Sequence, residues 1–413
     1  MFKVLDKIKG LNRAVIGGSL LLLITFNIFN ALNFLYHFAM ARLLSIADYG
    51  ILATLFSIIY IFSILTESFQ TVITRYSSRE ADGGKLKNII LRSFKRASKT
   101  GFFIFILYLA AAFPLSFALK INYWLMALNG IIIFLALFSP ITRGIMQGRK
   151  MFNALGLNMI IESGTKFILA LVLVVIGWKV YGAILATIVG GIVAIALSFF
   201  ALKKILRAKE GTANLSDIYA YSMPVFVTIF AILVFYSLDL IIAKIVFSPD
   251  VAGYYAIASM LGKIIFFGTE PISKAMFPLS AEDKSKKGKS AKNVFVNALG
   301  ILMFCIISAL LVYYFFPEIV VRIYSGRYIP ESASILFYVA LATSLLSLTN
   351  LILLYKISTG KLRGYWYFLA FIALEIFMLS YFSNSLMQFS LAFIAASAVF
   401  LWWAVFLMNK SEE

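Results

Sequence analysis

Apolar residues follow one another along this chain in long stretches that are separated by short polar connections. Each stretch is close to the roughly 20 residues that a helix needs to cross a bilayer. The pattern predicts twelve transmembrane helices, at residues 14–40, 50–74, 100–118, 123–146, 153–177, 180–202, 219–245, 251–277, 294–316, 332–357, 365–382 and 386–407. All five tryptophans fall near predicted helix ends, where the aromatic belt of a membrane protein lies.

The composition excludes a water-soluble globular protein. Of the 413 residues, 62% are hydrophobic and 13% are charged, whereas a soluble domain is about half apolar and a quarter charged. The single cysteine, Cys305, permits no internal disulfide, and the single histidine, His37, permits no zinc cluster of ordinary composition. We therefore expect an all-α polytopic membrane protein with no structural metal and no cofactor other than a coupling ion.

The distribution of lysine and arginine predicts the orientation in the membrane. Alternate connections and the two tails hold 29 of these residues, the other connections hold 6, and 2 lie inside spans, which accounts for all 37. This asymmetry indicates an even number of spans in the cytoplasmic membrane, with both termini cytoplasmic. The net charge of +19 is explained by the same bias, so we expect no nucleic-acid partner.

Two segments that lie about 200 residues apart indicate an internal repeat. The sequence HFAMARLLSIADYG at 37–50 aligns with DLIIAKIVFSPDVAG at 239–253. This alignment predicts two parallel six-helix lobes, at 1–202 and 218–413, joined by a cytoplasmic connection at 203–217. In transporters such repeats usually place the substrate path between the halves, so we expect a central cavity.

Charged residues inside the spans are candidates for function, because each costs about 2.5–3.5 kcal/mol at the bilayer centre on insertion scales. Glu162 and Lys166 are spaced i,i+4, as are Glu270 and Lys274, so each pair is either a structural ion pair or a contact to cargo. Lys263 has no acid one helical turn away. It therefore requires an acid from another helix or an anionic cargo.

Four further residues complete the candidate set. Asp239 and Glu375 have no cation at i±4, so a buried carboxylate here could bind and release a coupling cation. Asp239 could instead be a capped polar group at the water interface. Arg42 aligns with a lysine in the repeat and is a candidate for cargo contact. His37 aligns with Asp239 and is either a hydrogen-bonded core histidine or a proton relay.

Several motifs resemble one known family. These are AMARLLSIADYGILATLFSI, TRYSS, MQGRKMFNALGLNMIIE, YSMPVF, YSLDLIIAKI, AGYYAIASMLGKI and FPLSAE. They are similar to the polysaccharide-exporting lipid flippases, a branch of the superfamily that includes multidrug exporters and the lipid II flippase. The resemblance implies a two-lobed bundle that moves a polyprenyl-diphosphate-linked oligosaccharide by alternating access, often driven by a cation gradient.

The resemblance also implies roles for single residues. In the lipid II flippase, a basic residue on the corresponding helix contacts the diphosphate. Lys263 lies about one turn from the position that aligns with that residue. Asp239 and Glu375 resemble the acids of that flippase's sodium site, but Phe371 stands where the site has an amide. This difference leaves either Na⁺ or a proton as the coupling ion.

Three classes of function therefore remain open. The first is a flippase for lipid-linked oligosaccharide, and the second is an exporter of small amphiphilic cations with the same fold. The third is a membrane-bound enzyme of polysaccharide synthesis, which is disfavoured because no P-loop and no DxD triplet occur in the sequence. We expect the partners to be the cargo lipid and membrane lipids, and we expect a monomer that could contact polysaccharide-assembly proteins.

Overall fold

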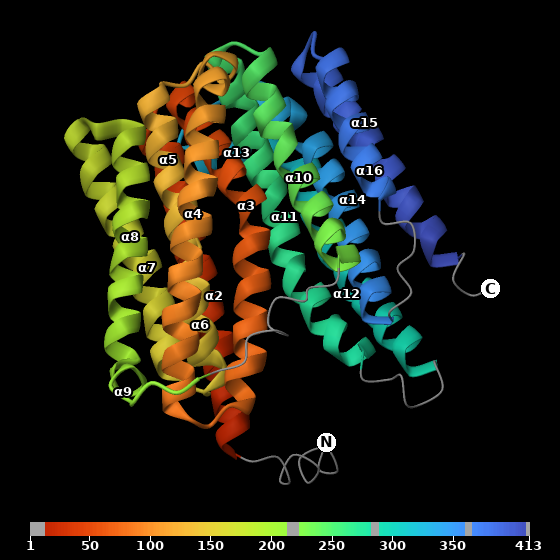
Figure 1. Cartoon of the computed structure of the whole chain (residues 1–413). Coiled ribbons are helices and arrows are strands. Elements are labelled where there is room, and N and C mark those ends of the chain that lie inside the picture. The colour runs from red at the N-terminus through yellow and green to blue at the C-terminus, as the bar shows by residue number, and fades with distance from the viewer. Residues whose placement is uncertain (1–12, 213–222, 282–288, 360–365, 410–413) are drawn as a thin grey trace. The chain divides into compact units, whose positions relative to one another are not determined.

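The structure is a computed structural model that describes residues 13–212, 223–281, 289–359 and 366–409 (Figure 1). Every regular element in these ranges is helical. The helices are α2 (Arg13–Leu43), α3 (Ile46–Arg79), α4 (Gly83–Leu119), α5 (Tyr123–Ala136), α6 (Ser139–Gly148), α7 (Phe152–Leu173), η1 (Val174–Trp178), α8 (Lys179–Ala201), α9 (Lys203–Leu206), α10 (Met223–Val246), α11 (Pro249–Ala281), α12 (Lys289–Phe315), α13 (Pro317–Ser325), α14 (Pro330–Thr359), α15 (Tyr367–Tyr381) and α16 (Leu386–Asn409).

The helices confirm the predicted all-α membrane architecture. Among the described residues, nine helical stretches are long and apolar enough to cross a membrane. One of them, 152–201, contains two predicted spans, because α7 and α8 pack along each other around the turn η1. Gly177 in this turn has φ 105°, a backbone conformation that is open to glycine and costly for other residues. The helix α2 covers the first predicted span, and the shorter apolar helix α15 covers the eleventh.

The chain forms two compact units. Unit 1 comprises Met1–Leu43, Leu65–Ser116 and Asn122–Tyr221, and unit 2 comprises Leu44–Ile64, Phe117–Ile121 and Ser222–Glu413. The first half of α3 thus belongs to unit 2, although it precedes the predicted connection in the chain. That connection, 203–217, is described as far as residue 212 and otherwise lies outside the described residues. The repeat symmetry of the two halves stays a prediction.

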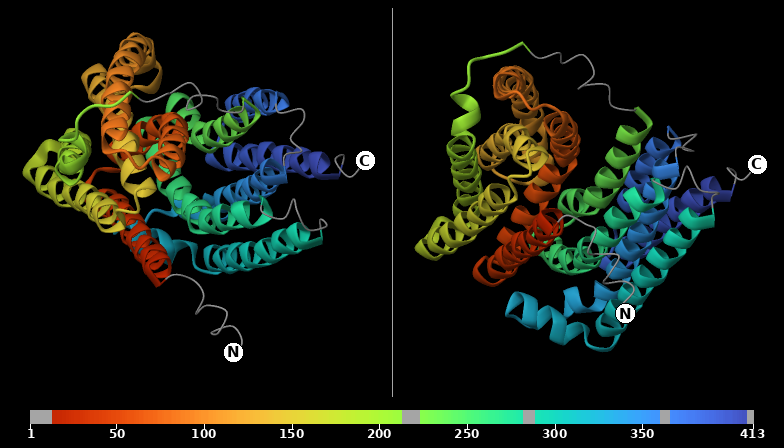
Figure 2. Two further views of the ribbon diagram at one scale, coloured as in Figure 1. Left: turned by 60° about the horizontal axis from the view of Figure 1, so that its bottom comes forward. Right: turned by 90° about the horizontal axis from the view of Figure 1, so that it is seen from below.

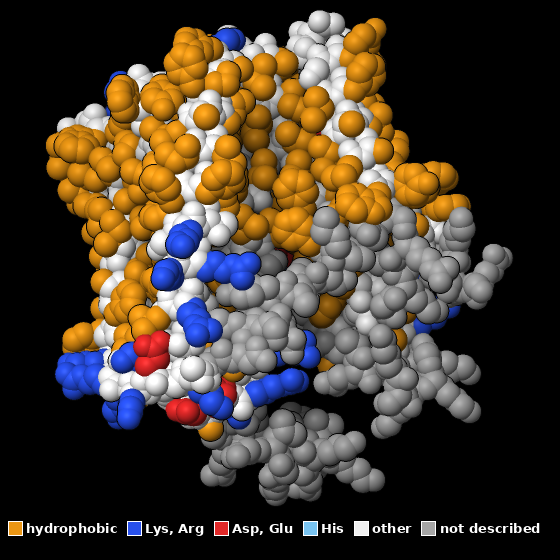
Figure 3. Space-filling view, viewed as in Figure 1, with side chains coloured by type: hydrophobic (Ala, Val, Ile, Leu, Met, Phe, Trp, Pro, Cys, Tyr) orange, Lys and Arg blue, Asp and Glu red, His pale blue; other side chains and the backbone are white. Residues whose placement is uncertain are grey.

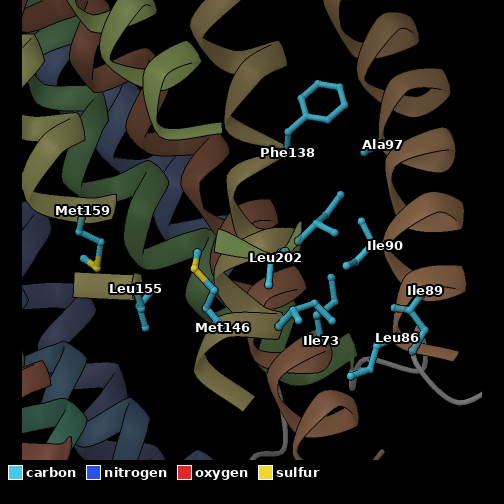
Figure 4. Close-up of a cluster of buried hydrophobic side chains, with 12 residues drawn as sticks. Ile73, Leu86, Ile89, Ile90, Ala97, Phe138, Met146, Leu155, Met159 and Leu202 are labelled. Carbon is cyan, nitrogen blue, oxygen red and sulfur yellow. The ribbon is translucent and has the colours of Figure 1, made fainter. Parts of the chain in front are cut away.

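The core of unit 1 lies where α4 packs against α6, α7 and the end of α8. Side chains from these helices form a cluster of buried apolar residues (Figure 4). From α4 it takes Leu86, Ile89, Ile90 and Ala97. This core fixes the rotation of α4 about its own axis, so its other face is directed away from the core.

Within unit 2, α3 and α11 approach closely through two glycines. A Cβ atom added to Gly50 would lie 3.0 Å from the Cα of Gly253, and one added to Gly253 would overlap the carbonyl group of Ile46. These glycines are also the two that align in the repeat. The close packing of the helix backbones therefore requires glycine at both positions.

Candidate functional site

A buried ion pair lies in the middle of unit 2. The Lys263 Nζ on α11 lies 2.9 Å from Asp239 Oδ1 on α10, and their side chains are 2% and 0% exposed. The acid from another helix that Lys263 requires is therefore Asp239. Asp239 has no cation at i±4 on its own helix, and the cation that pairs with it comes from the neighbouring helix α11.

The remaining oxygen of Asp239 is held by α11 as well. Ser259 Oγ donates to Asp239 Oδ2 at 2.5 Å, and the Tyr255 hydroxyl donates to the same atom at 3.3 Å. The Lys263 ammonium lies 4.6 Å from the centre of the Tyr236 ring, at cation–π distance. The ion pair therefore has the additional hydrogen bonds that a buried pair needs to be stable.

Glu375 on α15 lies within electrostatic range of this pair. Its side chain is 0% exposed, and neither of its carboxyl oxygens has a hydrogen-bond partner among the described residues. It interacts electrostatically with both Asp239 and Lys263. We call Asp239, Lys263 and Glu375, with Ser259 and Tyr255, the unit 2 cluster. It brings together two carboxyl groups and one ammonium group.

Glu270 and Lys274 form the ion pair that their i,i+4 spacing predicts. Lys274 Nζ lies 2.9 Å from Glu270 Oε1, and the side chains are 55% and 29% exposed. This part of α11 is thus well hydrated compared with the Asp239–Lys263 pair. Whether either residue contacts cargo stays a prediction.

In unit 1, Glu162 forms an ion pair that its spacing along α7 does not predict. It pairs with Arg143 of α6, and the Arg143 Nε also donates to Asn158 Oδ1 at 2.9 Å. Asn158 in turn donates to the carbonyl of Ala194 on α8 at 2.6 Å. Glu162 therefore links α6 to α7, and it also interacts electrostatically with Lys166, one turn along α7.

The buried Lys166 of α7 contacts α2. Its ammonium donates to the Asn33 side chain and lies 4.5 Å from the centre of the Tyr36 ring. Both of these partners are neutral. We call Arg143, Glu162 and Lys166, with Asn33 and Tyr36, the unit 1 cluster. Its two cations and one carboxylate give it a net charge of +1.

The other two candidates lie on α2. The His37 ring packs edge-on against Tyr36, with ring centres 5.2 Å apart. Arg42 is exposed in the last turn of the helix, and its guanidinium lies 4.3 Å from the centre of the Phe38 ring. His37 therefore adjoins the unit 1 cluster through Tyr36, and both its readings stay open.

Several of the side chains that contact these charged residues were not identified from the sequence. Tyr255, Ser259 and Lys263 are spaced at i, i+4 and i+8, so they form one stripe along α11. This spacing along the sequence could have predicted a polar face on α11. Asn33 and Arg143 offered no such signal, because each meets its partner through contact between two helices.

Two solved structures with clear similarity share the fold. An inward-facing multidrug resistance MATE family transporter of the MOP superfamily matches with a TM-score of 0.74 at 12% identity, covering 95% of this chain and 99% of that one. The lipid II flippase MurJ in an inward closed conformation matches with a TM-score of 0.70 at 14% identity, covering 94% and 87%. At these identities the matches establish the fold.

Sequence comparison identifies the family. A membrane protein of Methanocaldococcus jannaschii is 27% identical over 228 residues, which are 51% of this chain and 53% of that relative, so the match spans about half of its length. The family model described as "Polysaccharide biosynthesis protein" matches residues 16–284. This chain therefore belongs to the polysaccharide biosynthesis protein family.

Proposed function

We propose that this protein is a flippase that moves a polyprenyl-diphosphate-linked oligosaccharide across the cytoplasmic membrane. The observation that carries the proposal is the net positive charge of the unit 1 cluster on membrane-spanning helices. Arg143 pairs with Glu162, and Lys166 donates to Asn33 and lies over the Tyr36 ring, so the cluster holds two cations and one carboxylate. Charges at membrane depth are costly and mark the paths of ions and substrates. A cationic cluster of this kind suits a diphosphate.

The same cluster disfavours the main alternative. An exporter of small amphiphilic cations needs acidic or neutral groups where its cargo binds, because two cations in a medium of low polarity repel each other. The unit 1 cluster has the opposite sign. The family membership supports a role in polysaccharide assembly and favours transport over synthesis, which agrees with the proposal.

We assign coupling to the unit 2 cluster. Lys263 balances one of its two carboxyl groups, which leaves Glu375 able to take one further monovalent cation, either a proton or Na⁺. An ionised carboxylate that is buried without hydrogen-bond donors is energetically unfavourable. Binding a cation to it would therefore change the relative free energies of the conformations that the surrounding helices adopt. A single ion shared by Asp239 and Glu375 would lie beside the Lys263 ammonium, and the resulting repulsion favours Glu375 as the principal site.

Mass spectrometry of lipids that co-purify with the protein tests the proposed cargo. Wild-type protein should retain polyprenyl-diphosphate saccharides, and Lys166→Gln should retain far less. Lys179→Gln is the matched control, because Lys179 is an exposed lysine at the start of α8, directly after the turn η1 that joins α7 to α8. The proposal is wrong if wild-type protein retains no diphosphate-linked lipid but transports cationic dyes, which is the behaviour of the alternative exporter.

A further inference from the structure

The first half of α4 carries four basic residues on one face. Arg92, Lys95, Arg96 and Lys99 are all exposed. Their spacing of i, i+3, i+4 and i+7 places them in a single stripe along the helix. We call these four residues the α4 basic stripe. It belongs to neither of the two clusters described above.

The rest of the helix holds this stripe outward. Ile89, Ile90 and Ala97, which alternate with the basic residues along α4, are buried in the core of unit 1 (Figure 4). Phe94 packs against the rings of Phe138 and Phe199, at 5.3 and 5.1 Å between centres. Rotation of α4 would break this packing. The four cations therefore have a fixed direction, away from the core.

The depth of the stripe follows from the apolar residues that come after it. Phe102 and Phe103 are 60% and 63% exposed, and exposed apolar residues continue to Phe117. In a membrane protein such a surface is covered by lipid tails. Phe102 lies three residues after Lys99, a rise of about 4.5 Å along the helix. Lys99 is therefore placed at the level of the lipid headgroups, which extend roughly 5–8 Å beyond the hydrocarbon on each side. The stripe continues about 10 Å further along the helix to Arg92, whose long side chain can extend back toward the headgroups.

Acidic residues gather further from the apolar surface. Glu80 pairs with Lys85 at 3.5 Å, and Glu210 accepts a hydrogen bond from Asn88 at 2.6 Å. The segment 89–101 itself contains no acid. Figure 3 shows the same order, with basic side chains directly below the hydrophobic surface of this part of the molecule and acidic side chains lower. The stripe thus places four exposed basic side chains at and just beyond headgroup depth, in a stretch of α4 that contains no acidic residue.

We propose that the α4 basic stripe binds the phosphate groups of anionic phospholipids. Its charge complements a phosphodiester headgroup, and the adjoining apolar surface receives the acyl chains of the same lipid. Basic residues near an anionic membrane surface each strengthen binding, and arginine adds paired hydrogen bonds to phosphate oxygens. The inference goes beyond the proposed function, because it concerns bulk lipid and does not depend on the cargo.

Native mass spectrometry of the whole chain, titrated with phosphatidylglycerol or phosphatidylcholine, tests the proposal. The test variant is Lys95→Gln/Lys99→Gln. The matched control is Lys85→Gln/Lys87→Gln, which removes the same number of charges from the same helix, about 15–20 Å further from the apolar surface. Lys95→Arg/Lys99→Arg keeps the charge and the position.

Wild-type protein should bind phosphatidylglycerol more tightly than phosphatidylcholine. The test variant should bind phosphatidylglycerol about 30-fold more weakly, whereas the control and the arginine variant should resemble wild type. Equal binding of both lipids by wild type would overturn the proposal, and so would equal losses in the test variant and the control. In the latter case the residues act only as a topology signal. Neither result depends on whether the protein moves an oligosaccharide.

Discussion

The unit 1 and unit 2 clusters both place a buried lysine on a membrane-spanning helix, but they satisfy it in different ways. Lys263 has a carboxylate at 2.9 Å, and a second buried carboxyl group, Glu375, lies within electrostatic range. Lys166 contacts a neutral amide and an aromatic ring, while the acid one turn away is engaged by Arg143. The first arrangement suits uptake of a cation, and the second suits an anionic group.

Breaking the Asp239–Lys263 pair should have the largest effect on stability. Asp239→Asn leaves the Lys263 ammonium buried without its counter-charge, which typically costs about 3–5 kcal/mol. The measurement is unfolding of the purified protein by denaturant in detergent. Asp250→Asn is the matched control, because Asp250 is exposed at the start of α11. A loss below about 1 kcal/mol would show that Lys263 finds another partner, contrary to the geometry.

A double-mutant cycle sharpens this result. Adding Lys263→Met to Asp239→Asn removes the unpaired charge, so the double variant should be more stable than Asp239→Asn alone. The same unfolding measurement applies to all four proteins of the cycle. Strictly additive losses would mean that the two groups do not interact.

The Arg143–Glu162 pair of the unit 1 cluster should matter less for stability. Its side chains are 12% and 26% exposed, so water compensates part of the loss when Arg143→Gln breaks the pair. We expect destabilisation by about 2 kcal/mol, between the values for buried and surface pairs. Arg149→Gln, which changes an exposed arginine of the same unit, is the control and should be near neutral. If Arg143→Gln lost as much stability as Asp239→Asn, the ion pairs of the two clusters would not differ in their contribution to stability.

Among these variants, Glu270→Gln should change the free energy of unfolding least. The Glu270–Lys274 pair is more than half exposed on the lysine side, and solvent screening reduces such pairs to about 0.5 kcal/mol or less. The same unfolding measurement checks this. A substantial loss would place this end of α11 in a less hydrated environment than the structure gives it.

The sequence predicted the helices well because each apolar run is itself the signal for a span. It also predicted the pair Glu270–Lys274, which lies within one helix. It could not predict Asp239–Lys263 or Arg143–Glu162, which are 24 and 19 residues apart. Their contact depends on how two helices rotate against each other, and spacing along one helix carries no information about that.

One transport measurement tests the proposal that the unit 1 cluster binds an anionic group and the unit 2 cluster binds a cation. Wild-type protein, Lys166→Gln and Glu375→Gln are each reconstituted in proteoliposomes with a fluorescent polyprenyl-diphosphate oligosaccharide, and its translocation is followed with and without proton or Na⁺ gradients. Glu375→Gln should still translocate the lipid but should respond to neither gradient, whereas Lys166→Gln should lose most translocation under all conditions. Equal losses of translocation and of gradient response in both variants would contradict separate sites for the anion and the cation.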